Sequence, residues 1–203
     1  MDIAIVTLDC FNELDSFIAL GMLGRMQPHG WNVRISSPFA TLQSKNGVRM
    51  QRQENLEFAN RADAVLIGSG FRTRDWVADD AITRQFRLDP QRQLIGAQCS
   101  GALLLHRLGL LPDNIACSDD LTRPWLEQAG VAVPRQAFRA SGNIATAGGC
   151  LSSQYLASWV LLRLAGIERA REALSYVVPV GEEDATISRL LATVSTSAAA
   201  EAE

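Results

Sequence analysis

The chain has 203 residues, with 19 basic and 22 acidic side chains and a formal net charge of −3 at pH 7. This length suits one well-buried domain, and the near balance of charge excludes the basic footprint that nucleic acid or an anionic membrane requires. The N-terminus enters an apolar segment at once, without a cleavage-site pattern, and no later apolar run reaches the length of a membrane span. We expect a soluble, cytoplasmic protein with no nucleic-acid or membrane partner.

Short apolar runs alternate with longer segments of helical period, a pattern that predicts parallel strands joined by crossover helices. Strands are expected at residues 3–8, 32–36, 64–67 and 94–97, with weaker ones at 115–117 and 144–147. Helices are expected at residues 14–26, 100–108, 121–129, 151–164 and 168–176. The fold class is therefore α/β, with a doubly wound, mostly parallel sheet.

Two further segments complete the predicted organisation. In residues 40–50, apolar and polar side chains alternate on either side of Lys45-Asn46-Gly47. This pattern predicts a small β-hairpin excursion. Residues 1–183 are expected to form a single domain. Residues 184–203 are expected to be a polar, partly disordered C-terminal tail, because their Ser/Ala/Glu-rich end cannot build a core.

The most informative segment is residues 93–105, where an apolar strand runs into Cys99 and then directly into an apolar helix. This layout is typical of a nucleophile elbow, a sharp turn that needs small residues two positions before and after the nucleophile. Ala97 and Gly101 occupy those positions. The amides and dipole of the following helix would favour the thiolate of Cys99 and lower its pKa. The alternative interpretation is a buried, inert cysteine packed behind a helix.

Other candidate residues follow the ends of strands, where ligands bind in a doubly wound sheet. Asp15 opens the first helix, where it is either a helix cap or a protonated acid that moves a proton beside a thiolate. The Gly68-Ser69-Gly70 turn is either an ordinary tight turn or a source of amides for a developing negative charge. Gly148-Gly149 lets the next helix, at residues 151–164, start near the same edge.

Neither histidine is placed to activate Cys99. His106 lies on the helix that begins at Cys99, about 10 Å further along its axis, which is too far for a hydrogen bond. His29 lies in a turn at the far end of the first helix. We therefore expect no Cys–His dyad.

The four cysteines, Cys10, Cys99, Cys117 and Cys150, are far apart in the sequence and form no Cys-x-x-Cys pair. This spacing indicates neither a zinc site nor a disulfide framework, and it fits a reducing compartment. We expect no cofactor and no metal.

Taken together, these motifs resemble the ThiJ/PfpI superfamily of class I glutamine amidotransferase-like proteins, over about residues 3–179. The matching motifs are Glu13-Leu14-Asp15, Ile67-Gly68-Ser69-Gly70, Gln98-Cys99-Ser100-Gly101-Ala102, Leu108-Gly109-Leu110-Leu111 and the segment 141–149. The resemblance implies a flavodoxin-like fold with a cysteine at the elbow, and a homodimer.

Within the superfamily, the start of the first helix is similar to the isonitrile hydratase branch. In that branch a cysteine adds to an isocyanide carbon and water then gives an N-substituted formamide. The resemblance implies that Cys99 is the nucleophile and Asp15 the acid beside it. It also implies that Ser100 is a hydroxyl and amide partner, and that Gly70 supplies the second amide of an oxyanion pocket.

Three departures from the superfamily pattern narrow the expected chemistry. Asp119-Asp120 stands where a histidine is common, which removes the residue that protease or amidase chemistry would use. Phe17-Ile18-Ala19 replaces the Thr-Gly-Pro usual in the hydratase branch, which changes the substrate pocket. Cys10 lies near the position at which the glyoxalase and deglycase branch has a glutamate, so the resemblance favours that activity less.

We therefore expect a cysteine-dependent enzyme of hydratase type that acts on a small molecule. A non-enzymatic redox sensor or stress-response protein oxidised at Cys99 is one alternative. Glyoxalase or deglycase activity on 2-oxoaldehydes is another. A ligand-binding domain of a transcription regulator is less favoured, because no helix-turn-helix segment or basic patch is present.

Overall fold

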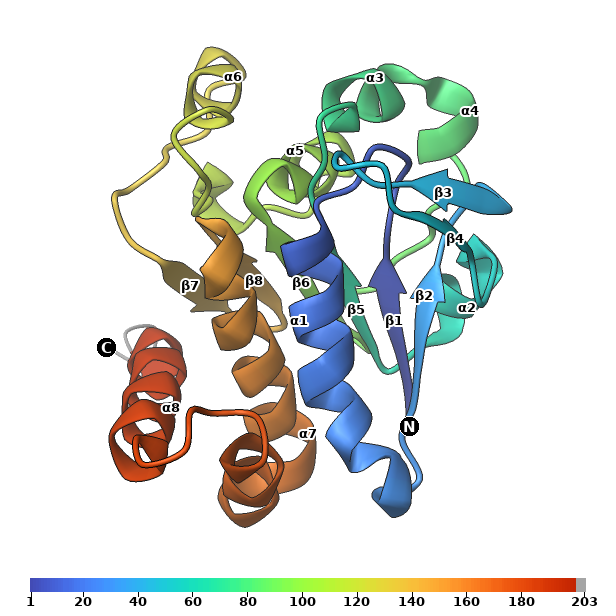
Figure 1. Ribbon diagram of the computed structural model, residues 1–203. Coiled ribbons are helices and arrows are strands. Elements are labelled where there is room, and N and C mark those ends of the chain that lie inside the picture. The colour runs from blue at the N-terminus through green and yellow to red at the C-terminus, as the bar shows by residue number, and fades with distance from the viewer. Residues whose placement is uncertain (200–203) are drawn as a thin grey trace.

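The computed structural model describes residues 1–199, which fold around a six-stranded sheet of order β2-β1-β5-β6-β8-β7 (Figure 1). Its strands are β1 (Asp2–Val6), β2 (Asn32–Ser36), β5 (Ala64–Ile67), β6 (Leu94–Gln98), β7 (Phe138–Ser141) and β8 (Ile144–Ala147). Neighbouring strands pair in parallel, except that β7 is antiparallel to β8. The predicted α/β class and mostly parallel sheet are confirmed.

The predicted hairpin is also confirmed. Strands β3 (Thr41–Gln43) and β4 (Arg49–Gln51) pair antiparallel and form a separate two-stranded sheet. This hairpin brings Lys45, at its turn, toward the carboxyl end of β1, because the Lys45 backbone N–H donates to the Phe11 carbonyl at 2.8 Å.

Each central strand is buried on both faces, as its continuous apolar sequence requires. Successive side chains of β1 enter different hydrophobic clusters: Ile3 and Ile5 pack on one side of the sheet, Ala4 and Val6 on the other. Helices therefore have to cover both faces, and the sheet has the layered architecture expected from the alternating sequence.

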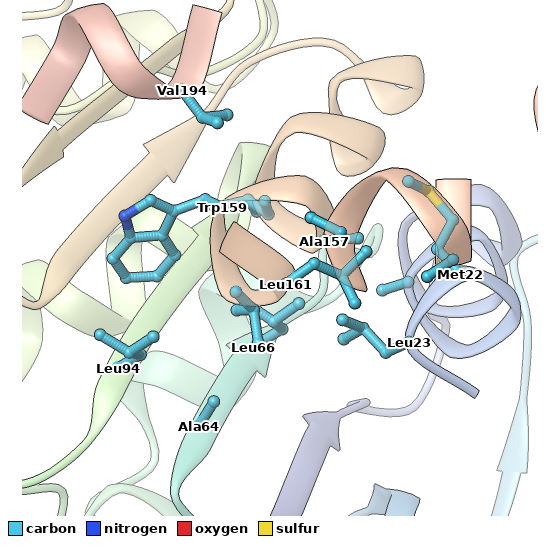
Figure 2. Close-up of a cluster of buried hydrophobic side chains, with 14 of the residues drawn as sticks. Met22, Leu23, Ala64, Leu66, Leu94, Ala157, Trp159, Leu161 and Val194 are labelled. Carbon is cyan, nitrogen blue, oxygen red and sulfur yellow. The ribbon is translucent and has the colours of Figure 1, made fainter. Parts of the chain in front are cut away.

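One face is covered by α1 (Glu13–Leu23), α7 (Ser153–Ser175) and α8 (Glu183–Ala199). In Figure 1, α1 and α7 lie in front of the sheet, and α8 lies to the left of α7, below β7. Figure 2 shows Leu161 of α7 over the sheet residue Leu66, and Trp159 of α7 between Leu94 of β6 and Val194 of α8. Trp159 is completely buried. This cluster is the larger half of the hydrophobic core.

The other face is covered by α2 (Leu56–Arg61), α4 (Asp80–Thr83) and α5 (Ala102–Arg107), with α3 (Thr73–Ala78) beside them. Helix α6 (Arg123–Gln128) packs through Leu126 against Ala102 and Leu103 of α5 in a smaller cluster. Short 3-10 turns complete the chain at Gly24–His29, Cys99–Gly101, Pro112–Asn114 and Cys150–Ser152.

The two helices expected at residues 151–164 and 168–176 are both present within α7. They are continuous except at Gly166, whose φ of 77° and ψ of 174° are not helical, so the helix kinks there. Despite the length of α7, none of the helices within residues 1–199 is apolar enough over a bilayer's thickness to span a membrane.

Two sequence predictions about local structure are wrong, and strand β7 was missed. Residues 115–117 form no strand, and only an isolated bridge joins Ile115 to Ala132. Strand β7 was not expected, because alternating exposure at this sheet edge leaves it only two well-buried side chains, Phe138 and Ala140. The first helix ends at Leu23 rather than residue 26, and a 3-10 turn containing Pro28 follows it.

The segment predicted to be a polar, partly disordered tail at residues 184–203 is helical as far as residue 199, because Glu183–Ala199 forms α8. Ile187, Leu190, Leu191 and Val194 recur at helical spacing and are at most 5% exposed. This apolar stripe joins the core beside α7, as Val194 above Trp159 illustrates (Figure 2). The sequence prediction missed this stripe because the average composition of residues 184–203 is polar. Residues 200–203 lie outside the described residues.

The packing of α8 predicts that the domain depends on it for stability. We expect Leu191→Ala to lower the free energy of unfolding by about 2–5 kcal/mol, because it removes a buried side chain and leaves a cavity. Ser188→Ala, on the exposed side of the same helix, should change it by less than about 0.5 kcal/mol. Urea unfolding of both variants tests this, and equal stability would show that α8 does not belong to the folding unit.

Candidate active site

Cys99 lies at a strained corner between β6 and α5. Its φ of 48° places it in the left-handed region, which a residue with a side chain adopts only where the surroundings enforce it. The chain then passes so close to β5 that a Cβ on Gly101 would lie 2.7 Å from the Ile67 carbonyl oxygen. The predicted nucleophile elbow, with its requirement for a small residue at position 101, is confirmed as a backbone geometry.

A cavity of about 300 Å³ lies at the carboxyl ends of the central strands, next to this corner. Its lining residues are Asn12, Lys45, Ser69, Gly70, Phe71, Cys99, Ser100, Asp119, Asp120, Leu121, Thr122, Trp125 and Cys150. Phe71 and Leu121 are 75% and 78% exposed and give the cavity an apolar rim. The elbow therefore opens on a space that can hold a small organic molecule.

Asp15 does not cap the first helix. That role belongs to Asn12, whose side chain accepts from the Leu14 backbone N–H at 3.3 Å. The Asp15 side chain is 3% exposed, and neither carboxylate oxygen has a hydrogen-bond partner of normal geometry among the described residues. Burial raises the pKa of Asp15 to about 6, although interactions with Ser69 and the charge of Lys45 oppose the rise.

The Asp15 carboxyl lies directly beside the elbow sulfur. One of its oxygens and the Sγ atoms of Cys99 and Cys150 all lie within 4.8 Å of one another. Cys99 and Cys150 line the cavity, whereas Asp15 is not among its lining residues. The predicted neighbourhood of Cys99 and Asp15 is therefore present in the fold.

The expected lowering of the Cys99 pKa is wrong. The Cys99 side chain is 3% exposed, and burial together with the negative charges of Asp15 and Asp119 raises the pKa of its thiol, against a weaker effect of the Gly149 backbone N–H. Since only a three-residue 3-10 turn and the six-residue α5 follow Cys99, the helix dipole is small. The proton therefore rests on sulfur, and the nearby carboxylate is the group placed to accept it.

Gly70 and Ser100 meet in the cavity wall, where they bond to one another. The Gly70 backbone N–H donates to Ser100 Oγ at 3.3 Å, and the Ser100 hydroxyl also contacts Thr73 Oγ1 at 3.0 Å. A Cβ on Gly70 would lie 2.5 Å from the Cys10 carbonyl oxygen, so this turn requires glycine. The two residues tie the elbow to the Gly-rich turn, and the Gly70 amide is already engaged rather than free for an oxyanion.

Sequence reasoning missed Cys150 as a site residue. Its Sγ accepts a hydrogen bond from Asn12 Nδ2 at 2.8 Å and lines the same cavity as Cys99. The Gly148-Gly149 pair was the available signal, since Gly149 has a φ of 86° and Gly148 packs directly against the Ser118 carbonyl. These glycines turn the chain sharply after β8, and the residue that follows them is delivered to the cavity.

Asp119, which stands where the superfamily often has a histidine, is held as a turn cap. Its carboxylate accepts from the backbone N–H groups of Leu121 and Thr122 at 2.9 and 3.0 Å, and from the Thr122 hydroxyl at 2.7 Å. Neither His29 nor His106 is among the cavity-lining residues. The lining of this cavity therefore includes no imidazole.

No protein-family model and no curated protein matches this sequence, but many solved structures match its fold. Schizosaccharomyces pombe DJ-1 superposes with a TM-score of 0.74 at 15% identity, covering 88% of this chain and 100% of that chain. Drosophila melanogaster DJ-1beta gives 0.74 at 18% identity, covering 87% and 96%. A ThiJ/PfpI family protein from Pseudomonas syringae gives 0.77 at 17% identity, covering 98% and 89%.

At these identities the matches establish a shared fold and nothing finer. They support the superfamily resemblance at the level of architecture, and they do not distinguish the isonitrile hydratase branch from the others. The chain has the flavodoxin-like α/β fold of the DJ-1 and ThiJ/PfpI proteins.

Proposed function

We propose that this protein is a cysteine-dependent enzyme that adds water to a small electrophilic carbon through a covalent adduct on Cys99. The proposal assigns isocyanides as the substrate class. The observation that carries it is the buried Asp15 carboxyl, which has no hydrogen-bond partner of normal geometry among the described residues and has an oxygen within 4.8 Å of the Cys99 sulfur.

A buried carboxyl without hydrogen bonds destabilises a fold, so its presence needs a reason other than packing. Asp15 has a pKa of about 6, and the neighbouring Cys99 thiol holds its proton at neutral pH. A carboxylate that titrates near neutrality beside a protonated nucleophile is an acid–base pair suited to moving one proton during a reaction. Strongly perturbed groups of this kind concentrate at active sites.

In the proposed reaction, Asp15 carries a proton in each step. As the sulfur attacks the terminal carbon of R–N≡C, the S–H proton passes through Asp15 to the same carbon, which gives a thioimidate, R–N=CH–S–Cys99. Water then adds across the C=N bond: its hydroxyl goes to carbon, and Asp15 accepts its proton and passes it to nitrogen. As the C–S bond breaks, the hydroxyl proton passes through Asp15 to the leaving sulfur. The products are the N-substituted formamide and the regenerated Cys99 thiol, so no redox partner is consumed.

The occupied Gly70 amide favours an isocyanide over a carbonyl substrate. Attack on a 2-oxoaldehyde places negative charge on oxygen, which needs a free donor, whereas the Gly70 N–H already donates to Ser100. Attack on an isocyanide places the charge on carbon, where a protonated Asp15 neutralises it directly. The apolar rim of Phe71 and Leu121, with Trp125 inside the cavity, suits an organic substituent on nitrogen.

The redox-sensor alternative gains less support from the site. The thiolate is the form that reacts with oxidants, and the buried Cys99 thiol retains its proton at neutral pH. The homodimer and the cytoplasmic location remain predictions from sequence and resemblance.

The first test is turnover of a panel of isocyanides and 2-oxoaldehydes by purified protein, followed by detection of formamides. We expect the wild type to hydrate isocyanides, Cys99→Ala to show no turnover, and Asp15→Asn to be slowed by about 10²–10⁴-fold, since it loses the acid–base group. Cys10→Ser is the matched control, because Cys10 is not among the cavity-lining residues.

Two results would contradict the proposal. Full turnover by Cys99→Ala would remove the covalent mechanism. Turnover of 2-oxoaldehydes alone would leave a cysteine enzyme but overturn the isocyanide assignment. Mass spectrometry of peroxide-treated protein addresses the sensor alternative separately: rapid, selective oxidation of Cys99 in a protein without turnover would favour it.

The second test uses the pH dependence of stability. The folded-state pKa of Asp15, about 6, lies above its reference value of 3.8, so its protonated form stabilises the fold at low pH and this contribution is lost as pH rises through about 6. Relative to Asp15→Asn, the wild type should lose on the order of 2–3 kcal/mol of unfolding free energy between about pH 4 and about pH 7. Urea unfolding across this range measures the difference.

The control for this measurement is Asp184→Asn, because Asp184 is an exposed carboxylate on α8. Its unfolding free energy should follow the wild-type pH curve. If Asp15→Asn also follows that curve, the carboxyl is not held in an unfavourable environment and cannot be the proton carrier.

A further inference from the structure

The mechanism proposed above leaves Cys150 without a role, although it lies in the same cavity as Cys99. The two sulfur atoms and an Asp15 carboxylate oxygen all lie within 4.8 Å of one another. These three groups come from three different segments, the starts of α1, of the elbow turn and of the turn before α7. Their convergence is therefore a property of the fold and not of local sequence.

Each sulfur is also met by a side-chain amide. Asn12 Nδ2 donates to Cys150 Sγ at 2.8 Å, and Gln98 Nε2 lies 3.6 Å from Cys99 Sγ. The Gln98 amide is held in place by a second hydrogen bond, to the Gly149 carbonyl at 2.6 Å. Amide donors aimed at sulfur stabilise negative charge there, and they orient ligand sulfurs in the way that outer-shell groups do in metal sites.

The Asp15 carboxylate is a second, independent observation. Asp15 is only 3% exposed, and neither oxygen has a hydrogen-bond partner of normal geometry among residues 1–199, although Ser69 lies close enough to interact with it. Buried carboxylates are normally hydrogen-bonded, paired with a cation or coordinated to a metal. No lysine or arginine forms an ion pair with Asp15 in the described part of the chain.

We propose that Asp15, Cys99 and Cys150 form a binding site for a thiophilic divalent cation of the Zn²⁺ class. Two thiolates and one carboxylate supply three ligands, and the fourth, open position faces the cavity, as in zinc sites that bind an exchangeable molecule. The sequence indicated no metal because these ligands are far apart in the chain and form no Cys-x-x-Cys pair. Folding brings them together.

The ligand types select the class of cation. Thiolate sulfur favours Zn²⁺ and related soft or borderline ions, whereas Mg²⁺ and Ca²⁺ require sets of oxygen ligands. Zn–S bonds of about 2.3 Å and Zn–O bonds of about 2.0–2.2 Å bring the ligand atoms of a tetrahedral site within about 4 Å of one another, so the observed cluster closes with small side-chain adjustments. Each coordinating thiol releases its proton to solvent, and no oxidant or reductant takes part.

This inference is independent of the proposed reaction. A cation on Cys99 occupies the lone pair that would attack a substrate, so binding of Zn²⁺ should inhibit the hydratase and a chelator should restore it. The metal site can therefore be present in a protein without hydratase activity, and hydratase activity can be present without a metal site.

Cobalt(II) is the probe that reports the ligands directly. We expect Co²⁺, added to the full chain under anaerobic conditions with a non-thiol reductant, to give sulfur-to-cobalt charge-transfer bands and the intense visible bands of a tetrahedral site. Zn²⁺ should displace it at one equivalent and abolish these bands. Protons released on Zn²⁺ binding, measured with an indicator in weak buffer, should confirm thiolate coordination.

The decisive variant is Cys150→Ser, because Cys150 is partly exposed and is not needed by the proposed reaction. We expect Cys150→Ser, Cys99→Ser and Asp15→Asn each to weaken Zn²⁺ binding at least about tenfold, and Cys10→Ser to leave it unchanged. The charge-transfer intensity should fall in both ligand cysteine variants but not in Asp15→Asn. Circular dichroism shows which variants are folded.

The proposal is overturned if the wild type binds Co²⁺ without charge-transfer bands, or if Cys150→Ser binds Zn²⁺ as tightly as the wild type. Absence of Zn²⁺ binding by the reduced wild type also overturns it. None of these outcomes bears on isocyanide turnover, which is measured separately in the presence of chelator.

Discussion

The left-handed backbone at Cys99 is the constraint on which the site depends. Helix α5 has to pack its apolar side chains on the sheet immediately after β6 ends, so the chain reverses within a three-residue turn. Gly101 then passes against the carbonyl of Ile67, and only glycine fits that approach. The strain of this corner is balanced by the apolar layers on either side, which hold β6 and α5 at fixed positions. A sulfur placed in this way cannot relax away from its neighbours.

Those neighbours are unusually unfavourable for an ionisable group. Burial and nearby carboxylates keep the Cys99 thiol protonated, while burial raises the pKa of Asp15. A core built only for stability would replace such groups with apolar side chains or give them hydrogen bonds. The fold accepts this local instability within an otherwise well-packed α/β domain, which is the pattern expected where function and stability compete.

Sequence alone predicted the parts of this molecule that follow local rules. The central strands, the hairpin and the elbow at Cys99 came from apolar runs and turn residues, and Asp15 was placed near Cys99 because the ends of parallel strands share one edge of the sheet. Three features depend on tertiary context. The apolar stripe of α8 is hidden in a polar average, Cys150 reaches the cavity only through a glycine turn, and the Cys99 pKa follows burial rather than the short helix after it.

The anchoring of the segment that carries Asp119 has a mechanical consequence. The Cys117 backbone N–H donates to Thr146 Oγ1 of β8 at 2.8 Å, and Gly148 packs against Ser118, so this segment is fastened to the strand that delivers Cys150. Two walls of the cavity are therefore joined to each other by direct contacts. The side chains of Phe71 and Leu121 stand outside this joined part of the wall, and their exposure gives the rim fewer packing constraints than the depth of the cavity.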